Sequence, residues 1–383
     1  MKSNRNMTQA FMILFTSLWL TVPAHANEPH LTHYKTKGAS VIIIIGDGMG
    51  YPQLEAASLT LKGQKGALVT QGLPYQSEIT TSSLFDQATD SAAAATAMGT
   101  GQKTNNGYVG RNPSGEDITN IFEIARANKI STGLITTVPL SHATPAGFAA
   151  HADHRDQKNR IIDQLLSRSR PNILFGAAEE INEKWARFKG YEVVNNRDAL
   201  MSYAPQSGEL LLSGQFGDKS LPWYSDKNSD LPDLPTMTAK ALELLPEPFL
   251  LVIESGKIDW GAHSGDLSQV VSEVQALDDT VLLISKWLKD HPAVTVFVTA
   301  DHETGGLIID GQPQQPGQLP PHRWTASRYE NGSFAHTTQK VPVFAMGYEA
   351  ATVKTLRDNT DIFFLTRRLM VGDPIIGIKK LDD

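Results

Sequence analysis

Several segments of this chain have the pattern of strands that are buried on both faces of a parallel sheet. The clearest is residues 41–45, a β-branched run without polar alternation. Further strands are predicted at residues 130–137, 172–175, 249–253, 294–299 and 341–346. Helices are predicted at residues 90–98, 117–128, 159–167, 236–245, 267–289 and 363–370. This alternation predicts an α/β fold in which a large, mostly parallel central sheet carries helices on both faces.

The N-terminus has the composition of a secretory signal. Lys2 and Arg5 precede an apolar core at residues 10–22, and Ala24-His25-Ala26 is a small-residue cleavage pattern. We therefore expect residues 1–26 to be a signal peptide and the protein to be periplasmic or secreted. The alternative is a membrane anchor, but the apolar stretch is shorter than the roughly 20 residues that span a bilayer. The chain has no cysteine, which excludes a disulfide and a lipoprotein anchor.

Residues 27–383 are predicted to form a single domain, with no internal repeat and no clear boundary. Residues 311–332 are rich in Pro, Gln and Gly, and we expect them to be an excursion over the surface. The formal charge of the full chain is −7, and removing Lys2 and Arg5 leaves 32 basic against 41 acidic residues, or −9. This charge argues against nucleic acid or an anionic membrane as the main partner.

Metal-ligand side chains follow, or nearly follow, several of the predicted strands. Asp47 lies in a glycine turn after residues 41–45, Glu254 follows residues 249–253, and Asp301-His302 follows residues 294–299. The carboxyl ends of parallel strands meet at one edge of a sheet, so these side chains are expected to converge. The turn at Asp47 is not a dinucleotide loop, because Tyr51 stands where the third glycine belongs. Taken alone, such a turn aspartate can also be structural.

A second group of candidates combines carboxylate and imidazole. Asp259 and His263 are four residues apart and share a face of a helical turn. His142 and Thr144 lie just after the strand that begins near residue 130, and His336 stands alone near the C-terminus. Carboxylate with imidazole suits zinc, while carboxylate with hydroxyl suits magnesium. A structural salt-bridge cluster is the alternative, and the segment offers only Lys257 as a basic partner.

The third group suits a phosphoryl group. Asp90 is a plausible N-cap of the Ala-rich helix that follows, and Ser91 opens that helix. Free backbone N–H groups and the positive end of the helix dipole favour an alkoxide and a bound phosphate there. Arg155 adds a guanidinium fork that matches two phosphate oxygens. A plain capping serine and a solvated arginine are the structural alternatives.

Together these motifs make the chain resemble the alkaline phosphatases. The resemblance runs from about residue 41 to residue 346 and rests on Asp47-Gly-Met-Gly50, Asp90-Ser-Ala92, Glu254 with Asp259 and His263, and Thr299-Ala-Asp-His302. It implies a three-layer α/β/α sandwich and a phosphate-monoester hydrolase that works through a phosphoserine at a site with two zinc ions and one magnesium ion. It also implies small phosphate monoesters as substrates and a homodimer without a membrane anchor.

The resemblance implies a role for each candidate. The first zinc would be held by Asp259, His263 and His336, and the second by Asp47, Asp301, His302 and the Ser91 oxygen. Magnesium would be held by Asp47, Thr144 and Glu254, with His142 beside it, and Arg155 would clamp the phosphate, oriented by Asp90. The enterobacterial type has Asp where His142 stands and Lys where Trp260 stands. The third site is therefore open to magnesium, zinc or another transition metal.

Three alternatives remain on the sequence. Phosphodiesterases and nucleotide pyrophosphatases of the same superfamily typically use a threonine nucleophile and lack the third metal site, whereas this chain has Ser91, Thr144 and Glu254. Sulfatases carry a Cys/Ser-x-Pro-x-Arg motif that is missing around Ser91. A non-catalytic periplasmic protein that binds phosphate or metal would not need an intact nucleophile.

Overall fold

The structure is a computed structural model that describes residues 38–372, apart from residues 180, 206–207, 227–229 and 316. The predicted signal peptide at residues 1–26 lies outside the described residues. Within the part of the chain that the structure describes, no helix is both long and apolar enough to cross a bilayer.

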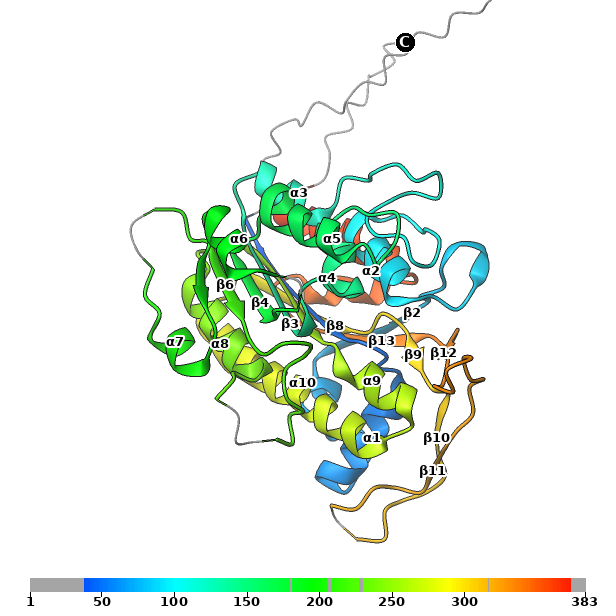
Figure 1. Ribbon diagram of the computed structural model, residues 1–383. Helices are drawn as coiled ribbons and strands as arrows, with labels where there is room; N and C mark the ends of the chain where they lie inside the picture. The colour runs from blue at the N-terminus through cyan, green and yellow to red at the C-terminus, as the bar shows by residue number, and fades with distance from the viewer. Residues whose placement is uncertain (1–37, 180, 206–207, 227–229, 316, 373–383) are drawn as a thin grey trace, which may run out of the picture. The chain divides into compact units, whose positions relative to one another are not determined.

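A nine-stranded sheet forms the centre of the fold (Figure 1). Its order is β2-β13-β8-β1-β7-β3-β4-β6-β5. The strands are β1 (Ser40–Gly46), β2 (Tyr75–Ile79), β3 (Ser131–Pro139), β4 (Ile173–Ala177), β5 (Glu192–Val194), β6 (Leu212–Gln215), β7 (Phe249–Ser255), β8 (Val294–Thr299) and β13 (Val341–Gly347). Only β13 runs antiparallel to its neighbours, β8 and β2. The predicted mostly parallel α/β sheet is confirmed.

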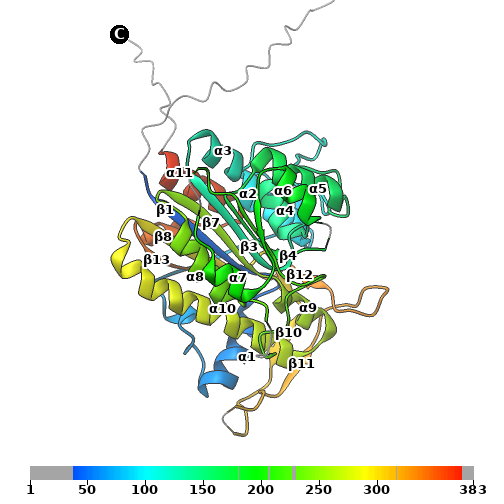
Figure 2. The same ribbon diagram turned by 60° about the vertical axis from the view of Figure 1, so that its left-hand side comes forward.

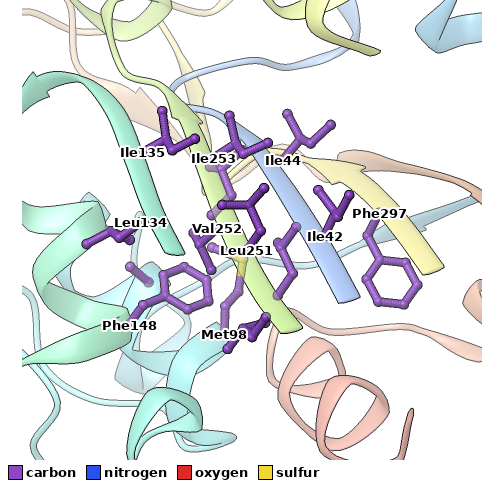
Figure 3. Close-up of a cluster of buried hydrophobic side chains, with 14 of the residues drawn as sticks. Ile42, Ile44, Met98, Leu134, Ile135, Phe148, Leu251, Val252, Ile253 and Phe297 are labelled. Carbon is purple, nitrogen blue, oxygen red and sulfur yellow. The ribbon is translucent and has the colours of Figure 1, made fainter. Parts of the chain in front are cut away.

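The middle of the sheet is buried on both faces, as the apolar runs predict. Every residue of β1 is buried, and Ile44 pairs in register with Ile253 of β7 and Val298 of β8. Figure 3 shows Ile42 and Ile44 of β1 beside Ile253 of β7 and Phe297 of β8. Burying such side chains removes apolar surface from water, at about 25 cal/mol per Å². A shift of this register would expose buried side chains and is therefore unfavourable. The register thus determines where the strands end and where the residues after them lie.

Helices cover both faces of this sheet (Figures 1 and 2). One layer contains α2 (Ser91–Thr100), α3 (Ile121–Ala127), α4 (Ala143–Ala149), α5 (Lys158–Gln164) and α11 (Thr360–Val371), and the other contains α1 (Tyr51–Lys62), α8 (Leu234–Leu244), α9 (Lys257–Ser264) and α10 (Leu267–Trp287). The described helices also include α6 (Glu183–Phe188) and α7 (Arg197–Ser202). Two small ladders, β10 (Leu307–Ile309) with β11 (His322–Trp324) and β9 (Glu303–Thr304) with β12 (His336–Thr337), lie outside the main sheet.

Several of the described helices differ from the sequence prediction, which gave no helix at α1, α4, α6 or α7. The helix expected at residues 117–128 begins only at Ile121. The Asn120 side chain caps it by accepting from the Glu123 N–H, and the Asn120 N–H donates in return to the Glu123 carboxylate. Helix α1 was not predicted at all, although it carries two local signals. Pro52 lies in its first turn, and Gly63 ends it at φ +72°.

Helix α2 packs unusually close to α4. All ten residues of α2 are buried. A Cβ on Gly147 of α4 would lie 2.6 Å from the Ala95 Cβ, and one on Gly99 would lie 2.8 Å from the Gly147 carbonyl oxygen. The backbones of α2 and α4 are therefore in direct contact, which the small side chains of the Ala-rich sequence allow. This close contact fixes the N-terminus of α2, where Ser91 lies.

Candidate active site

The predicted ligand residues converge at the carboxyl edge of the central strands. Asp47 follows β1, Glu254 is the sixth residue of β7, and Asp301 and His302 follow β8. The pairing of β1 with both β7 and β8 brings these three strand ends side by side. The side chains of Asp47, Asp301 and His302 are fully buried.

One cluster is centred on the His302 imidazole. Its Nε2 lies 3.3 Å from the Ser91 Oγ, 3.2 Å from an Asp301 carboxylate oxygen and 3.6 Å from an Asp47 carboxylate oxygen. The Gly48 N–H donates to the other Asp301 oxygen at 3.0 Å and fixes that carboxylate. Ligand atoms of Asp47, Asp301 and His302 all lie within 4.8 Å of one another, a spacing that one metal ion can bridge.

A second cluster contains Asp259, His263 and His336. The Nε2 atoms of the two histidines lie 3.1 Å apart, and each is within 3.1 or 3.5 Å of an Asp259 oxygen. Their Nδ1 atoms face backbone carbonyl oxygens, His263 that of Phe334 at 2.5 Å and His336 that of Thr89 at 2.8 Å. An Nδ1–H that donates to a carbonyl leaves the Nε2 lone pair free for a metal.

The third cluster joins Asp47, His142 and Glu254, whose ligand atoms also lie within 4.8 Å of one another. The Thr144 hydroxyl donates to the second Asp47 oxygen at 3.5 Å. Glu254 accepts a short hydrogen bond from Thr136. Asp47 is therefore shared between two clusters.

These clusters contain buried polar atoms that have no hydrogen-bond partner among the described residues. They are one oxygen each of Asp47, Glu254 and Asp301, and the His142 Nδ1. The first and third lie near the His302 Nε2, but that atom cannot satisfy both. An unsatisfied buried polar atom costs about 1–3 kcal/mol, so a set of four calls for a missing partner. All four are carboxylate oxygen or imidazole nitrogen atoms, the kinds of atom that coordinate metal ions, and a cation fits them.

The pKa values of the acidic groups report the same crowding. Burial, with the charge of Asp301 next, raises the pKa of Asp47 well above its usual range. Burial and the Asp259 charge raise the pKa of Asp301 to about 6. Burial also raises the pKa of Glu254 to about 7, against the hydrogen bonds from Thr136 and Thr144. Carboxylates held this close without a counter-charge take up protons. Bound metal ions would supply the counter-charge and displace those protons.

The pKa values of His142, His302 and Asp259 are all lowered, but burial is the cause for the two histidines and hydrogen bonding for the aspartate. Burial and then Arg155 lower the pKa of His142 to about 3, and burial lowers the pKa of His302 well below its usual range. Both imidazoles are therefore neutral and available as ligands. Burial opposes ionisation of Asp259, but hydrogen bonds from His263 and His336 outweigh it and lower its pKa well below the usual range.

A hydrogen-bonded group of Asp90, Gly107 and Arg155 lies beside the clusters. Asp90 caps α2 through a hydrogen bond from the Ala93 N–H at 2.9 Å, and its other oxygen accepts from the Arg155 guanidinium at 3.1 Å. The same oxygen accepts from the Gly107 N–H at 3.0 Å, while the Arg155 N–H donates to the Gly107 carbonyl at 2.8 Å. Arg155 is thus anchored on both sides. It is a quarter exposed, so its remaining N–H groups can reach a phosphate.

Every predicted site residue thus belongs to one assembly, which also contains two threonines that the sequence did not predict. Thr304 donates to an Asp259 oxygen at 2.6 Å and lies 3.2 Å from the His302 Nδ1. Thr136 holds Glu254. The position of Thr304 two residues after His302 was a weak signal for the first. Thr136 had none, because it depends on β3 lying next to β7 in register.

Comparison with known proteins gives a consistent result. A model of the alkaline phosphatase family matches residues 39–176 and 176–320. Alkaline phosphatase H of Pseudomonas aeruginosa is 29% identical over 409 residues, covering 88% of this chain and 86% of that protein. The structure of a cold-active alkaline phosphatase from a psychrophilic Shewanella is 26% identical, with a TM-score of 0.75 over 86% of this chain and 99% of the other.

A third relative bears on the metals. The alkaline phosphatase of the Antarctic bacterium TAB5, as a histidine-to-glutamate variant with magnesium bound in its M3 site, is 25% identical to this chain. The TM-score is 0.72, over 88% of this chain and 98% of the other.

Proposed function

The chain belongs to the alkaline phosphatase family, and we propose that it hydrolyses phosphate monoesters at the assembly of Ser91, Arg155 and the three ligand clusters. One observation carries the proposal. A serine hydroxyl at a helix N-terminus lies 3.3 Å from the His302 Nε2, next to clusters of carboxylates and imidazoles with unsatisfied atoms. A structural role for these residues would leave those atoms without partners.

The donor sets favour particular metals. Asp259, His263 and His336, and likewise Asp47, Asp301 and His302, combine carboxylate with imidazole and suit two zinc ions. Asp47, Glu254 and Thr144 supply the oxygen ligands that magnesium prefers, and His142 leaves this third site open to zinc or another transition metal. Such ions activate a hydroxyl or water and neutralise charge on phosphoryl oxygens.

The chain's own residues orient the reaction. The α2 N-terminus presents the Ser91 Oγ together with backbone N–H groups that attract the phosphate. Arg155, held by Asp90, binds two of its oxygens and stabilises the charge that they carry in the transition state. The Ser91 oxygen bonds to phosphorus as the ester oxygen leaves on the opposite side, toward Asp259, His263 and His336. Water then attacks the phosphorus, the bond from the Ser91 oxygen to phosphorus breaks, and the serine takes up a proton as inorganic phosphate is released.

The cluster of Asp47, His142 and Glu254 favours a monoesterase over a diesterase of the same superfamily, because the diesterases typically lack a third metal site. A non-catalytic protein that binds phosphate or metal would have no use for Ser91 at that position. It would bind phosphate tightly without turnover.

Phosphate release can be measured for enzyme loaded with zinc and magnesium and for the same preparation after chelation. The proposal predicts turnover only with metal, and metal analysis should give two zinc ions and one further ion per chain. Mass spectrometry after acid quenching should place a phosphate on Ser91. Tight phosphate binding with no turnover in the loaded protein would refute an enzymatic role.

We also propose that residues 1–26 direct export to the periplasm or medium and that the enzyme is a homodimer. N-terminal sequencing of the protein from an expressing cell should begin at Asn27. Light scattering should give twice the mass of the mature chain. An intact N-terminus or a monomer would contradict the respective proposal.

A further inference from the structure

A shallow hollow of about 480 Å³ adjoins the second ligand cluster. One wall comes from α9 and the other from the turn at residues 329–333. Its lining residues are Trp260, His263, Ser264, Tyr329, Asn331 and Ser333. His263 is at once a candidate metal ligand and part of the wall, so the hollow begins where the leaving oxygen departs in the proposed reaction.

The turn at residues 329–333, which forms the outer wall, is held close to α9 by hydrogen bonds. Tyr329 and Ser333 close the turn through a backbone hydrogen bond of 2.8 Å, and Gly332 supplies the positive φ of +84° that the turn requires. Phe334 then fastens the turn to α9, donating its N–H to the His263 carbonyl at 2.9 Å and accepting from the His263 Nδ1. Figures 1 and 2 show α9 next to β12, the strand that follows this turn.

Two aromatic rings face this space. The Tyr329 ring centroid lies 5.9 Å from that of His263, and the His336 N–H approaches the Tyr329 hydroxyl oxygen at 3.4 Å. The Trp260 ring stands edge-on to His142 at 6.2 Å. Tyr329 is nevertheless 47% exposed. A large ring that the fold leaves half exposed beside a reaction centre is a candidate for contact with a ligand.

The serine and asparagine side chains of the lining already form hydrogen bonds with one another or with the backbone. The Ser264 hydroxyl donates to the Gly261 carbonyl at 2.9 Å, and the Ser333 hydroxyl donates to the Asn331 side-chain oxygen at 2.7 Å. Both hydroxyl protons are thus used within the wall. The six lining residues include no lysine or arginine, so the hollow offers no fixed cation to a second phosphate or a carboxylate.

Building on the proposed function, we propose that this hollow is a leaving-group subsite for an aromatic ring bonded directly to the ester oxygen. Aryl phosphates are then the preferred class of monoester. The ring lies between Trp260 and Tyr329, whose faces and edges offer offset or edge-on stacking.

The test compares kcat/KM for phenyl phosphate and for cyclohexyl phosphate, two esters of similar size. Leaving-group chemistry differs between these esters but is the same for every enzyme variant, so it cancels when their ratio is compared across variants. Tyr329→Leu and Trp260→Leu should each lower the phenyl-to-cyclohexyl ratio by about three- to tenfold, the range of one aromatic contact. Tyr329→Phe keeps the ring and should keep the ratio.

Tyr348→Leu is the matched control, because Tyr348 is also an exposed tyrosine. Its N–H donates to the carbonyl of Val294, at the start of β8, whereas Asp301 and His302 follow the end of that strand. This substitution should leave the ratio unchanged. A parallel fall of both rates in Tyr329→Leu would overturn the subsite, because the ring would then act only through His263 or His336.

Calorimetric binding of benzylphosphonate and cyclohexylmethylphosphonate, in which a methylene replaces the ester oxygen, separates this proposal from the catalytic one. These analogues bind without turnover, so the same change in ratio is expected in their dissociation constants. If the wild-type protein hydrolyses neither ester, the proposed function fails. Equal binding of the two phosphonates by the wild type and Tyr329→Leu would refute the subsite, whether or not the protein is catalytic.

Discussion

The buried ion pair between Lys257 and Glu273 gives a sharp prediction about the support of the site. The two side chains are 1% exposed, and the Lys257 Nζ lies 3.4 Å from a Glu273 oxygen. Lys257 also donates to the carbonyls of Leu221 and Pro222 at 2.9 and 2.6 Å. It opens α9, two residues before Asp259, so it ties the ligand-bearing helix to α10 and to the loop around residue 222.

Lys257→Met removes one partner and leaves a buried carboxylate without its counter-charge. Such a change costs about 3–5 kcal/mol of the free energy of unfolding. Burial already lowers the pKa of Lys257 and raises that of Glu273, which indicates how little solvation the pair receives. Glu273→Gln removes the other charge but keeps an acceptor for the Tyr224 N–H, which donates to Glu273 at 2.8 Å. The double variant should therefore cost less than the sum of the singles, by about 1–3 kcal/mol.

Urea unfolding at fixed zinc and magnesium concentrations, followed by tryptophan fluorescence, measures these differences. The control is Lys340→Met, which breaks a 2.7 Å pair with Glu78 whose two side chains are about half exposed. An exposed pair of this kind contributes about 0–1 kcal/mol. The ion pair would not have the stabilising role expected here if Lys257→Met costs no more than Lys340→Met, or if the costs of the two single changes add within about 0.5 kcal/mol.

Three further predictions concern the site itself. Ser91→Ala should lose most turnover while keeping its zinc content, because its hydroxyl is the proposed nucleophile; activity near wild type would remove that role. Arg155→Ala should weaken product inhibition by phosphate more than metal binding, and unchanged inhibition would count against the clamp. In chelated protein, the raised pKa values of His263 and Glu254 mean that the folded state holds protons that the unfolded chain has released. Stability of the chelated form should therefore fall as pH rises through about 7, and the Tm gap to the metal-loaded form should widen over that range; a constant gap in calorimetry would contradict this.

The sequence predicted the strand ends well, because a buried strand has a continuous apolar pattern and the residue after it is then placed at an edge. Asp47, Glu254 and His302 were found in this way. What it could not supply was the order of strands. Thr136 reaches Glu254 only because β3 lies beside β7.

Other features depended on contacts between distant segments. β13 resembles the other buried strands in composition, and its antiparallel direction follows from the path of the chain before it. Residues 311–332 were expected to cross the surface on their composition alone. That Tyr329 would face His263 depends on the hydrogen bonds between Phe334 and α9, which no local pattern encodes.

The central claim is that Asp47, His142 and Glu254 complete a monoesterase site around Ser91. The most direct measurement is kcat/KM for an aryl phosphate monoester and the matching diester, side by side on one preparation loaded with zinc and magnesium. We expect the monoester rate to exceed the diester rate by orders of magnitude. A preference for the diester would contradict this expectation and would remove the roles assigned to Thr144 and Glu254.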